Sequence, residues 1–235
     1  MNMKKILFTI AFFACLSSYS QMSADVNFQN QFNQVAVLDL SPIYKGLEKQ
    51  RQFYTEDQWK ALMQKKYLTP AYNPCYIDDF KNLGYLKYNL ADDQMEFLKD
   101  NETLYLKKEL GRTIKFTTLK TTYKVFELNG RLDYFVVQKE GKNSLLVKQV
   151  VKFIKPKEPN TSYDEYKPAN FMRVKDQYFL ALDNKDLVKI PRKKKKFYPI
   201  FGDKSDQIKS YVKTNKLSYK SLGDLEKIVT YFNTL

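Results

Sequence analysis

The residue types most able to do chemistry are gathered in a run of five adjacent cations, Arg192, Lys193, Lys194, Lys195 and Lys196. Such a run attracts phosphate groups, anionic lipid headgroups or acidic polysaccharide, and the two aromatic residues that follow it offer surfaces for stacking. The plainer interpretation is a solvated, charged turn between the last strand and the C-terminal helices, because most charge runs have that role. We therefore take the run as a candidate anion-binding patch.

Paired carboxylates form the second group with chemical potential, at Asp78-Asp79 and at Asp92-Asp93. A glycosidase needs two carboxyl groups that face each other across a cleft at ~5–9 Å, one of them with a raised pKa. Adjacent acids point apart, and Asp92-Asp93 falls where a hairpin should reverse, so both pairs favour turn chemistry. We predict no catalytic residue from them, although a carboxylate-based glycan hydrolase stays as an alternative function.

The chain contains no histidine, and this excludes much of the remaining chemistry. Ser-His-Asp and Cys-His nucleophile systems need an imidazole that exchanges a proton near neutral pH, and many zinc and copper sites need it as a ligand. No Gly-rich phosphate loop or metal-spaced acidic loop is visible in the sequence either. We therefore predict neither a metal nor a cofactor.

Residues 1–20 have the three parts of a cleavable secretory signal peptide. Two lysines open the segment, residues 6–14 form an apolar run, and Ser18 and Ser20 give the small-x-small pattern at which a signal peptidase cuts. The apolar run is too short to span a membrane, which needs ~20 residues. No later segment reaches that length, so we predict an exported protein of the periplasm or the outer-membrane periphery with no transmembrane segment in its mature chain.

Cleavage after Ser20 changes the net charge and the cysteine content of the chain. Removing Lys4 and Lys5 lowers the formal net charge from +14 to +12, so the mature chain stays strongly basic. Cys15 leaves with the signal, so Cys75 stands alone, no internal disulfide can form, and a buried, unreactive thiol is the interpretation we favour. The alternative at Cys15 is a lipid anchor, for which the residues before it are a weak match. Export also argues against nucleic acid as the partner.

Residues 21–79 are predicted to hold a polar arm (21–34), a short strand (35–38), one helix and a proline-broken loop (69–79). The helix covers 55–66 and has both an N-cap and an apolar stripe at helical spacing. The cap is Thr55, and the stripe consists of Trp59, Leu62 and Met63.

Short apolar–polar runs separated by turn residues fill residues 80–190. Asn129-Gly130 is the strongest hairpin signal among them, and runs this close together leave no room for crossover helices. We predict an α+β fold whose main part is an antiparallel β meander, either a curved sheet or a small barrel, with a longer surface loop at 155–168. The expected strands are 84–90, 93–98, 102–107, 113–119, 122–128, 131–138, 144–154, 171–175, 177–182 and 186–190.

Residues 191–235 are predicted to form a C-terminal helical cap that either packs on one face of the sheet or covers its edge. Ser221 is placed as the N-cap of the last helix, with Asp224 three residues on, and Asp203 or Ser205 as the cap of the helix before it. The apolar stripes of the two helices are Ile208, Tyr211 and Val212, and Leu222, Leu225, Ile228, Val229 and Phe232.

Four stretches of the sequence resemble an uncharacterised group of exported, strand-rich envelope proteins from Bacteroidota. They are YLKYNLADDQMEF (85–97), SLLVKQVVKF (144–153), YKPANFMRVKDQYFLAL (166–182) and DLEKIVTYFN (224–233). The resemblance covers roughly residues 80–233, and it leaves out 40–80. It implies a Gram-negative envelope setting, and because the group has no established activity it carries no functional residues to this chain.

These observations favour a non-enzymatic exported envelope protein that binds a partner protein or an anionic envelope component, such as polysaccharide or lipid headgroups. The glycan hydrolase named above is one alternative, and it needs a cleft with two facing carboxylates. A lipocalin-like binder of a small apolar ligand is the other, and it needs a barrel whose mouth is lined by Tyr and Phe.

Overall fold

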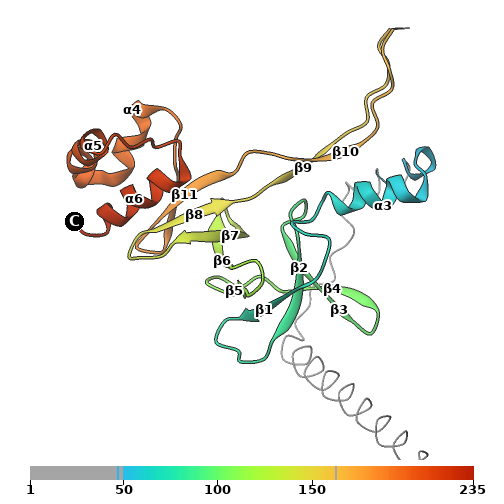
Figure 1. Ribbon diagram of the computed structural model, residues 1–235, viewed down its shortest axis with the longest axis horizontal. Helices are drawn as coiled ribbons and strands as arrows, with labels where there is room; N and C mark the ends of the chain where they lie inside the picture. The colour runs from blue at the N-terminus through green and yellow to red at the C-terminus, as the bar shows by residue number, and fades with distance from the viewer. Residues whose placement is uncertain (1–46, 48–49, 162) are drawn as a thin grey trace, which may run out of the picture.

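The computed structural model describes Leu47, residues 50–161 and residues 163–235 (Figure 1). These residues form the predicted α+β structure, with ten strands in one antiparallel sheet, two strands in a separate ribbon and a group of helices at the C-terminal end. No helix in this part of the chain is long and apolar enough to cross a membrane.

Several predictions concern residues outside those that the structure describes. They are the export signal (1–20), the polar arm (21–34), the short strand (35–38) and the lipid anchor at Cys15. These stay predictions from the sequence.

The large sheet is open, and of the two predicted forms it is the curved sheet that is found. Its strand order is β12-β11-β8-β7-β6-β5-β1-β2-β3-β4, every neighbouring pair is antiparallel, and among the described residues its outer strands β12 and β4 do not pair with each other. The strands are β1 (Asn73–Ile77), β2 (Gly84–Asn89), β3 (Gln94–Lys99), β4 (Glu102–Tyr105), β5 (Thr113–Phe116), β6 (Thr121–Leu128), β7 (Arg131–Lys139), β8 (Ser144–Lys148), β11 (Gln177–Leu182) and β12 (Asp186–Lys189).

The loop predicted over 69–79 is wrong, because it contains β1. This strand lies between β5 and β2, so β5 pairs with β1 and the simple meander is interrupted. The prolines of the segment suggested a loop, but Pro74 is near the start of the strand, where its missing N–H is tolerated and its carbonyl still accepts from the N–H of Thr117 at 3.0 Å. Cys75 and Ile77 then point into the core, with Tyr76 between them exposed.

The hairpin predicted at Asn129-Gly130 is confirmed. Both residues have positive φ, 53° and 75°, which is the geometry of a two-residue type I′ turn. Leu128 and Arg131 pair directly across this turn, and β6 and β7 extend from it as the two longest strands of the described sheet.

The helix predicted from the Trp59 stripe is confirmed as α3 (Glu56–Gln64), which follows a short 3-10 turn, η1 (Arg51–Phe53). Thr55 caps it reciprocally: its hydroxyl accepts from the N–H of Gln58 at 3.3 Å, and its own N–H donates to the Gln58 side chain at 2.9 Å. Leu62 is buried, and Trp59 and Met63 pack on the core of the N-terminal half of the sheet.

The C-terminal helices cover one face of the other half of the sheet (Figure 1). Adjacent residues of a strand point to opposite faces, so Leu145 of β8 and Leu180 of β11 meet the helices. Their neighbours Leu146 and Phe179 enter a second core on the far face, together with Phe135. The helical elements are α4 (Lys194–Phe197), the 3-10 segment η2 (Tyr198–Lys204), α5 (Ser205–Thr214) and α6 (Leu222–Phe232).

The centre of each predicted stripe is buried, Ile208 and Val212 in α5 and Leu225, Ile228 and Val229 in α6. Ser221 is the N-cap residue of α6 as predicted, but the predicted side-chain caps do not form. Ser221 occupies the N-cap position of α6 without a side-chain bond to the helix, and Asp224 accepts instead from the N–H of Ser218 at 3.0 Å. Neither Asp203 nor Ser205 caps α5, because η2 runs directly into it and the N–H of Ser205 bonds within that turn. The turn replaces the side-chain cap.

The strand predicted over 144–154 is two strands, β8 and β9 (Val151–Ile154), and β9 pairs with β10 (Asn170–Arg173) as a separate ribbon. Figure 1 shows this ribbon leaving the sheet and passing beside α3, with the predicted loop 155–168 at its far end. The Tyr54 hydroxyl donates to the carbonyl of Ala169 at 2.8 Å and fastens the ribbon at this point.

Cys75 is fully buried, and burial raises the pKa of its thiol to about 12. We predict that the native protein does not react with a thiol reagent at neutral pH, because a buried thiol at that pKa holds almost no thiolate. The same thiol should react at once when the chain is unfolded in guanidinium. Rapid labelling of the folded protein would show that β1 opens readily.

Candidate functional site

The predicted cation run forms the first turn after the sheet and stays on the surface. Lys194, Lys195 and Lys196 lie in α4, preceded by Lys193 at its N-cap position and by Arg192, and all five side chains are exposed. The plainer interpretation placed a turn here, and the structure has a single helical turn.

An aromatic anchor beneath the run holds this turn in place. Phe197 is fully buried, its ring stacks on Tyr219 with the ring centres 4.9 Å apart, and it meets the edge of Phe201 at 5.3 Å. Because the backbone that carries the cations is fixed by a buried ring, the cations project from a rigid turn.

Beside the run, a cavity of about 720 Å³ opens between β11, β12 and the segment before α6. The residues that line it include the two apolar residues before Arg192, four cations and two tyrosines. The cations and tyrosines are Lys175, Lys189, Arg192, Lys220, Tyr178 and Tyr219. Arg192 belongs to both the run and the cavity, so the two form one continuous surface, which we call the basic groove.

The cations of the basic groove have few acids to pair with. Asp176 is the acidic residue that lines the cavity, and its Oδ1 lies 2.6 Å from Nη2 of Arg173. From Lys189 to Lys220 the sequence carries eleven Lys and Arg residues and two Asp residues. Within the described chain, neither Lys175, Lys220 nor any cation of the run makes an ion pair. The groove can therefore attract a multiply charged anion.

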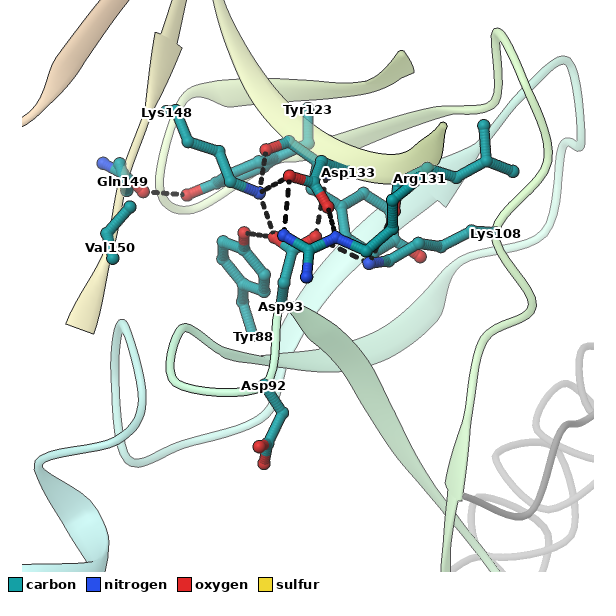
Figure 2. A network of polar contacts seen from close by, with 12 residues as sticks. Tyr88, Asp92, Asp93, Lys108, Tyr123, Arg131, Asp133, Lys148, Gln149 and Val150 are labelled. Carbon is teal, nitrogen blue, oxygen red and sulfur yellow. Dashed lines mark hydrogen bonds and ion pairs between the residues drawn. The ribbon is translucent and has the colours of Figure 1, made fainter. Parts of the chain in front are cut away.

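A second set of charges lies between the turn that joins β2 to β3 and the strands β7 and β8 (Figure 2). Asp93, in the turn between β2 and β3, accepts from the Nζ atoms of Lys148 and Lys108, each at 2.6 Å, on its two carboxylate oxygens. The Tyr88 hydroxyl donates to Oδ1 at 2.5 Å and the N–H of Tyr134 to Oδ2 at 3.2 Å. This turn residue thus contacts strands that are distant in the sequence.

Asp133 of β7 completes this buried charge network. Its Oδ2 is 3.4 Å from Lys148 Nζ, and its side chain is only 2% exposed. Arg131, 77% exposed, reaches over it and donates from Nε at 3.0 Å. Two carboxylates therefore share one buried ammonium, with a solvent-facing guanidinium on the outer side.

The two ammonium groups decide the charge on Asp93. Burial alone would raise the pKa of this carboxyl, but Lys148 and Lys108 outweigh it and hold the pKa below its usual range. Burial lowers the pKa of Lys108, with Asp93 opposing that shift. Burial and the neighbouring Asp93 raise the pKa of Tyr88 far above that of free tyrosine.

This geometry does not suit glycoside hydrolysis. Neither Asp93 nor Asp133 lines the cavities described for this part of the chain, and the pKa of Asp93 is lowered where a general acid needs a raised one. Asp78, in the turn after β1, accepts from the N–H of Thr113 in β5 at 2.6 Å and from Arg112 at 3.2 Å. Both predicted carboxylate pairs lie in turns, as expected.

The buried network was missed because its members lie far apart in the sequence. One signal was available: Asp133 interrupts the apolar run of β7, and a lone acid at an inward position needs a buried partner. Nothing local pointed to Lys148 or Asp93 as that partner. The cavity was missed for the same reason, since β11, β12 and the segment before α6 meet only in the fold.

Comparison with protein-family models gives no match for this chain, and comparisons with curated proteins and with solved structures give none either. The fold and the site therefore define a class only: an α+β protein with an open, curved antiparallel sheet and an exposed basic groove on its helical side.

We predict that Lys148→Met lowers the free energy of unfolding by about 3–5 kcal/mol, because it leaves two buried carboxylates short of a cation. Arg131→Met is the matched control, since it removes a cation that contacts Asp133 from the exposed side and should cost under about 1 kcal/mol. Urea unfolding followed by circular dichroism measures both. Equal losses would show that Lys148 is not the critical partner.

Proposed function

We propose that this protein is a non-enzymatic, exported protein of a Gram-negative cell envelope that binds an anionic polysaccharide of that envelope through the basic groove. The observation that carries the proposal is the groove itself: exposed cations without acidic partners in the described chain, arranged around two tyrosines. Export and the envelope setting rest on the leader-like start of the sequence and on its resemblance to the Bacteroidota group.

The chemistry of the groove favours a sugar polymer over a simple ion. Its cations extend from the cavity along α4, so several negative groups along a chain can be contacted at once. Tyr178 and Tyr219 line the same cavity, and aromatic rings that carry hydroxyl groups are suited to contact with sugar rings. Acidic sugars supply both features in one ligand.

The two alternatives find less support in the structure. The open sheet gives no barrel interior in the described part of the chain, which a lipocalin-like binder needs. The buried carboxylates are engaged by cations and do not face the described cavities, which a glycan hydrolase would require. Binding by surface charge needs neither arrangement.

We predict that the exported chain is retained on an acidic polysaccharide resin and that salt elutes it. Substituting Lys194, Lys195 and Lys196 together with Gln should lower the slope of log affinity against log salt, by roughly one for each cation that contacts an anionic group. A neutral polysaccharide resin should not retain the protein.

The matched control removes the same charge elsewhere, by substituting Lys60, Lys115 and Lys139 with Gln. These lysines are exposed on α3, β5 and β7. If both triple variants lose retention equally, binding follows net charge and the groove has no special role. Retention by anionic lipid vesicles but not by the acidic resin would replace the polysaccharide with a membrane surface.

A further inference from the structure

Lys148 and Asp93 are placed for a reaction with each other. Nζ of Lys148 is 2.6 Å from Oδ1 of Asp93, the two side chains are 9% and 14% exposed, and Asp133 is 3.4 Å from the same Nζ. We propose that these residues form an intramolecular isopeptide bond after folding, with Asp133 transferring the protons. The bond would join the end of β8 to the turn between β2 and β3.

The surroundings of this pair favour condensation. The ring of Phe135 lies 5.3 Å from Nζ of Lys148. The hydroxyl of the buried Tyr88 donates to Oδ1 of Asp93, and the backbone N–H of the buried Tyr134 donates to Oδ2. An amine and a carboxyl that are held in contact react as an intramolecular pair, with a high effective concentration.

The neighbouring groups can serve each stage of the reaction. Asp133 takes a proton from the Lys148 ammonium, and the freed Nζ attacks Cγ of Asp93. Charge that develops on Oδ2 is held by Lys108 Nζ at 2.6 Å and by the N–H of Tyr134 at 3.2 Å, as in an oxyanion hole. Oδ1, which accepts from the Tyr88 hydroxyl, is the oxygen that leaves.

The atoms of this step balance without any further reactant. A new N–C bond forms between Nζ and Cγ, and the bond between Cγ and Oδ1 breaks. Of the three protons on the Lys148 ammonium, one stays on the amide nitrogen and two leave with Oδ1 as water. Asp133 ends in the protonation state in which it began, so it acts as an acid–base catalyst.

The same network also limits the rate. Burial would raise the pKa of Asp93, but the two ammonium groups hold it below its usual range, so the uncharged form of this carboxyl is a minor population. We therefore expect bond formation to be slow compared with folding. It happens once in each molecule and needs no turnover, so a slow step still reaches completion. The cross-link would take the place of a disulfide, because the described residues include a single cysteine, Cys75.

The mass of the folded protein tests this proposal independently of what the groove binds. Under denaturing conditions the purified chain should weigh one water less than its sequence requires, and digestion should yield one branched species that contains both Asp93 and Lys148. Lys148→Met should have the full mass of its sequence. A folded wild-type chain at full mass overturns the proposal, and so does a bond from Asp93 to Lys108.

Asp133→Asn separates the proposed chemistry from simple proximity. It keeps both reacting residues but removes the proton acceptor, so it should stay at full mass or lose water much more slowly after refolding. Arg131→Met is the control, because it changes a residue next to Asp133 without touching the reacting pair, and it should lose water as the wild type does. Circular dichroism confirms that each variant is folded. Water loss in Asp133→Asn at the wild-type rate would contradict the role given to Asp133.

Discussion

In the chain as it folds, before the proposed cross-link forms, the largely buried carboxylate of Asp93 is the contact on which the arrangement of the sheet depends. A charge in the interior is stable only when cations and hydrogen-bond donors surround it, and here they come from β2, β7, β8 and the segment after β4. Satisfying this one group therefore fixes the β2–β3 hairpin against strands that follow it much later in the chain. The C-terminal helices pack on β7 and β8, so the position of the basic groove also depends on the contacts of Asp93.

Much of the fold could be predicted from local patterns, because alternation, caps and turn residues act over short distances. The Trp59 stripe with its Thr55 cap and the Asn129-Gly130 hairpin were found for this reason. The interruption of the meander could not be found, because it depends on β1 pairing with β5 across a long stretch of chain. Pro74 further obscured it, since proline usually marks a loop and only its place near the strand start makes it acceptable.

The candidate site likewise has parts that the sequence could locate and parts that it could not. The cation run is contiguous, so the sequence alone located it, and the fold kept its five side chains exposed. The cavity beside it is assembled from β11, β12 and the segment before α6, and no local pattern joins Tyr178 to Tyr219. The sequence pointed to one half of the aromatic anchor beneath the run, because Phe197 follows the cations directly. Its stacking partner, Tyr219, lies much further along the chain and could not be found in this way.

The basic groove is the proposed place of binding. Nuclear magnetic resonance shift mapping with a short acidic oligosaccharide tests this directly on the folded, isotope-labelled chain. If the oligosaccharide binds in the groove, we expect salt-sensitive shifts in the amides of Arg192 to Lys196 and around Tyr178 and Tyr219. Shifts confined to the β9–β10 ribbon or to α3, or none at a concentration at which the resin retains the protein, would contradict it.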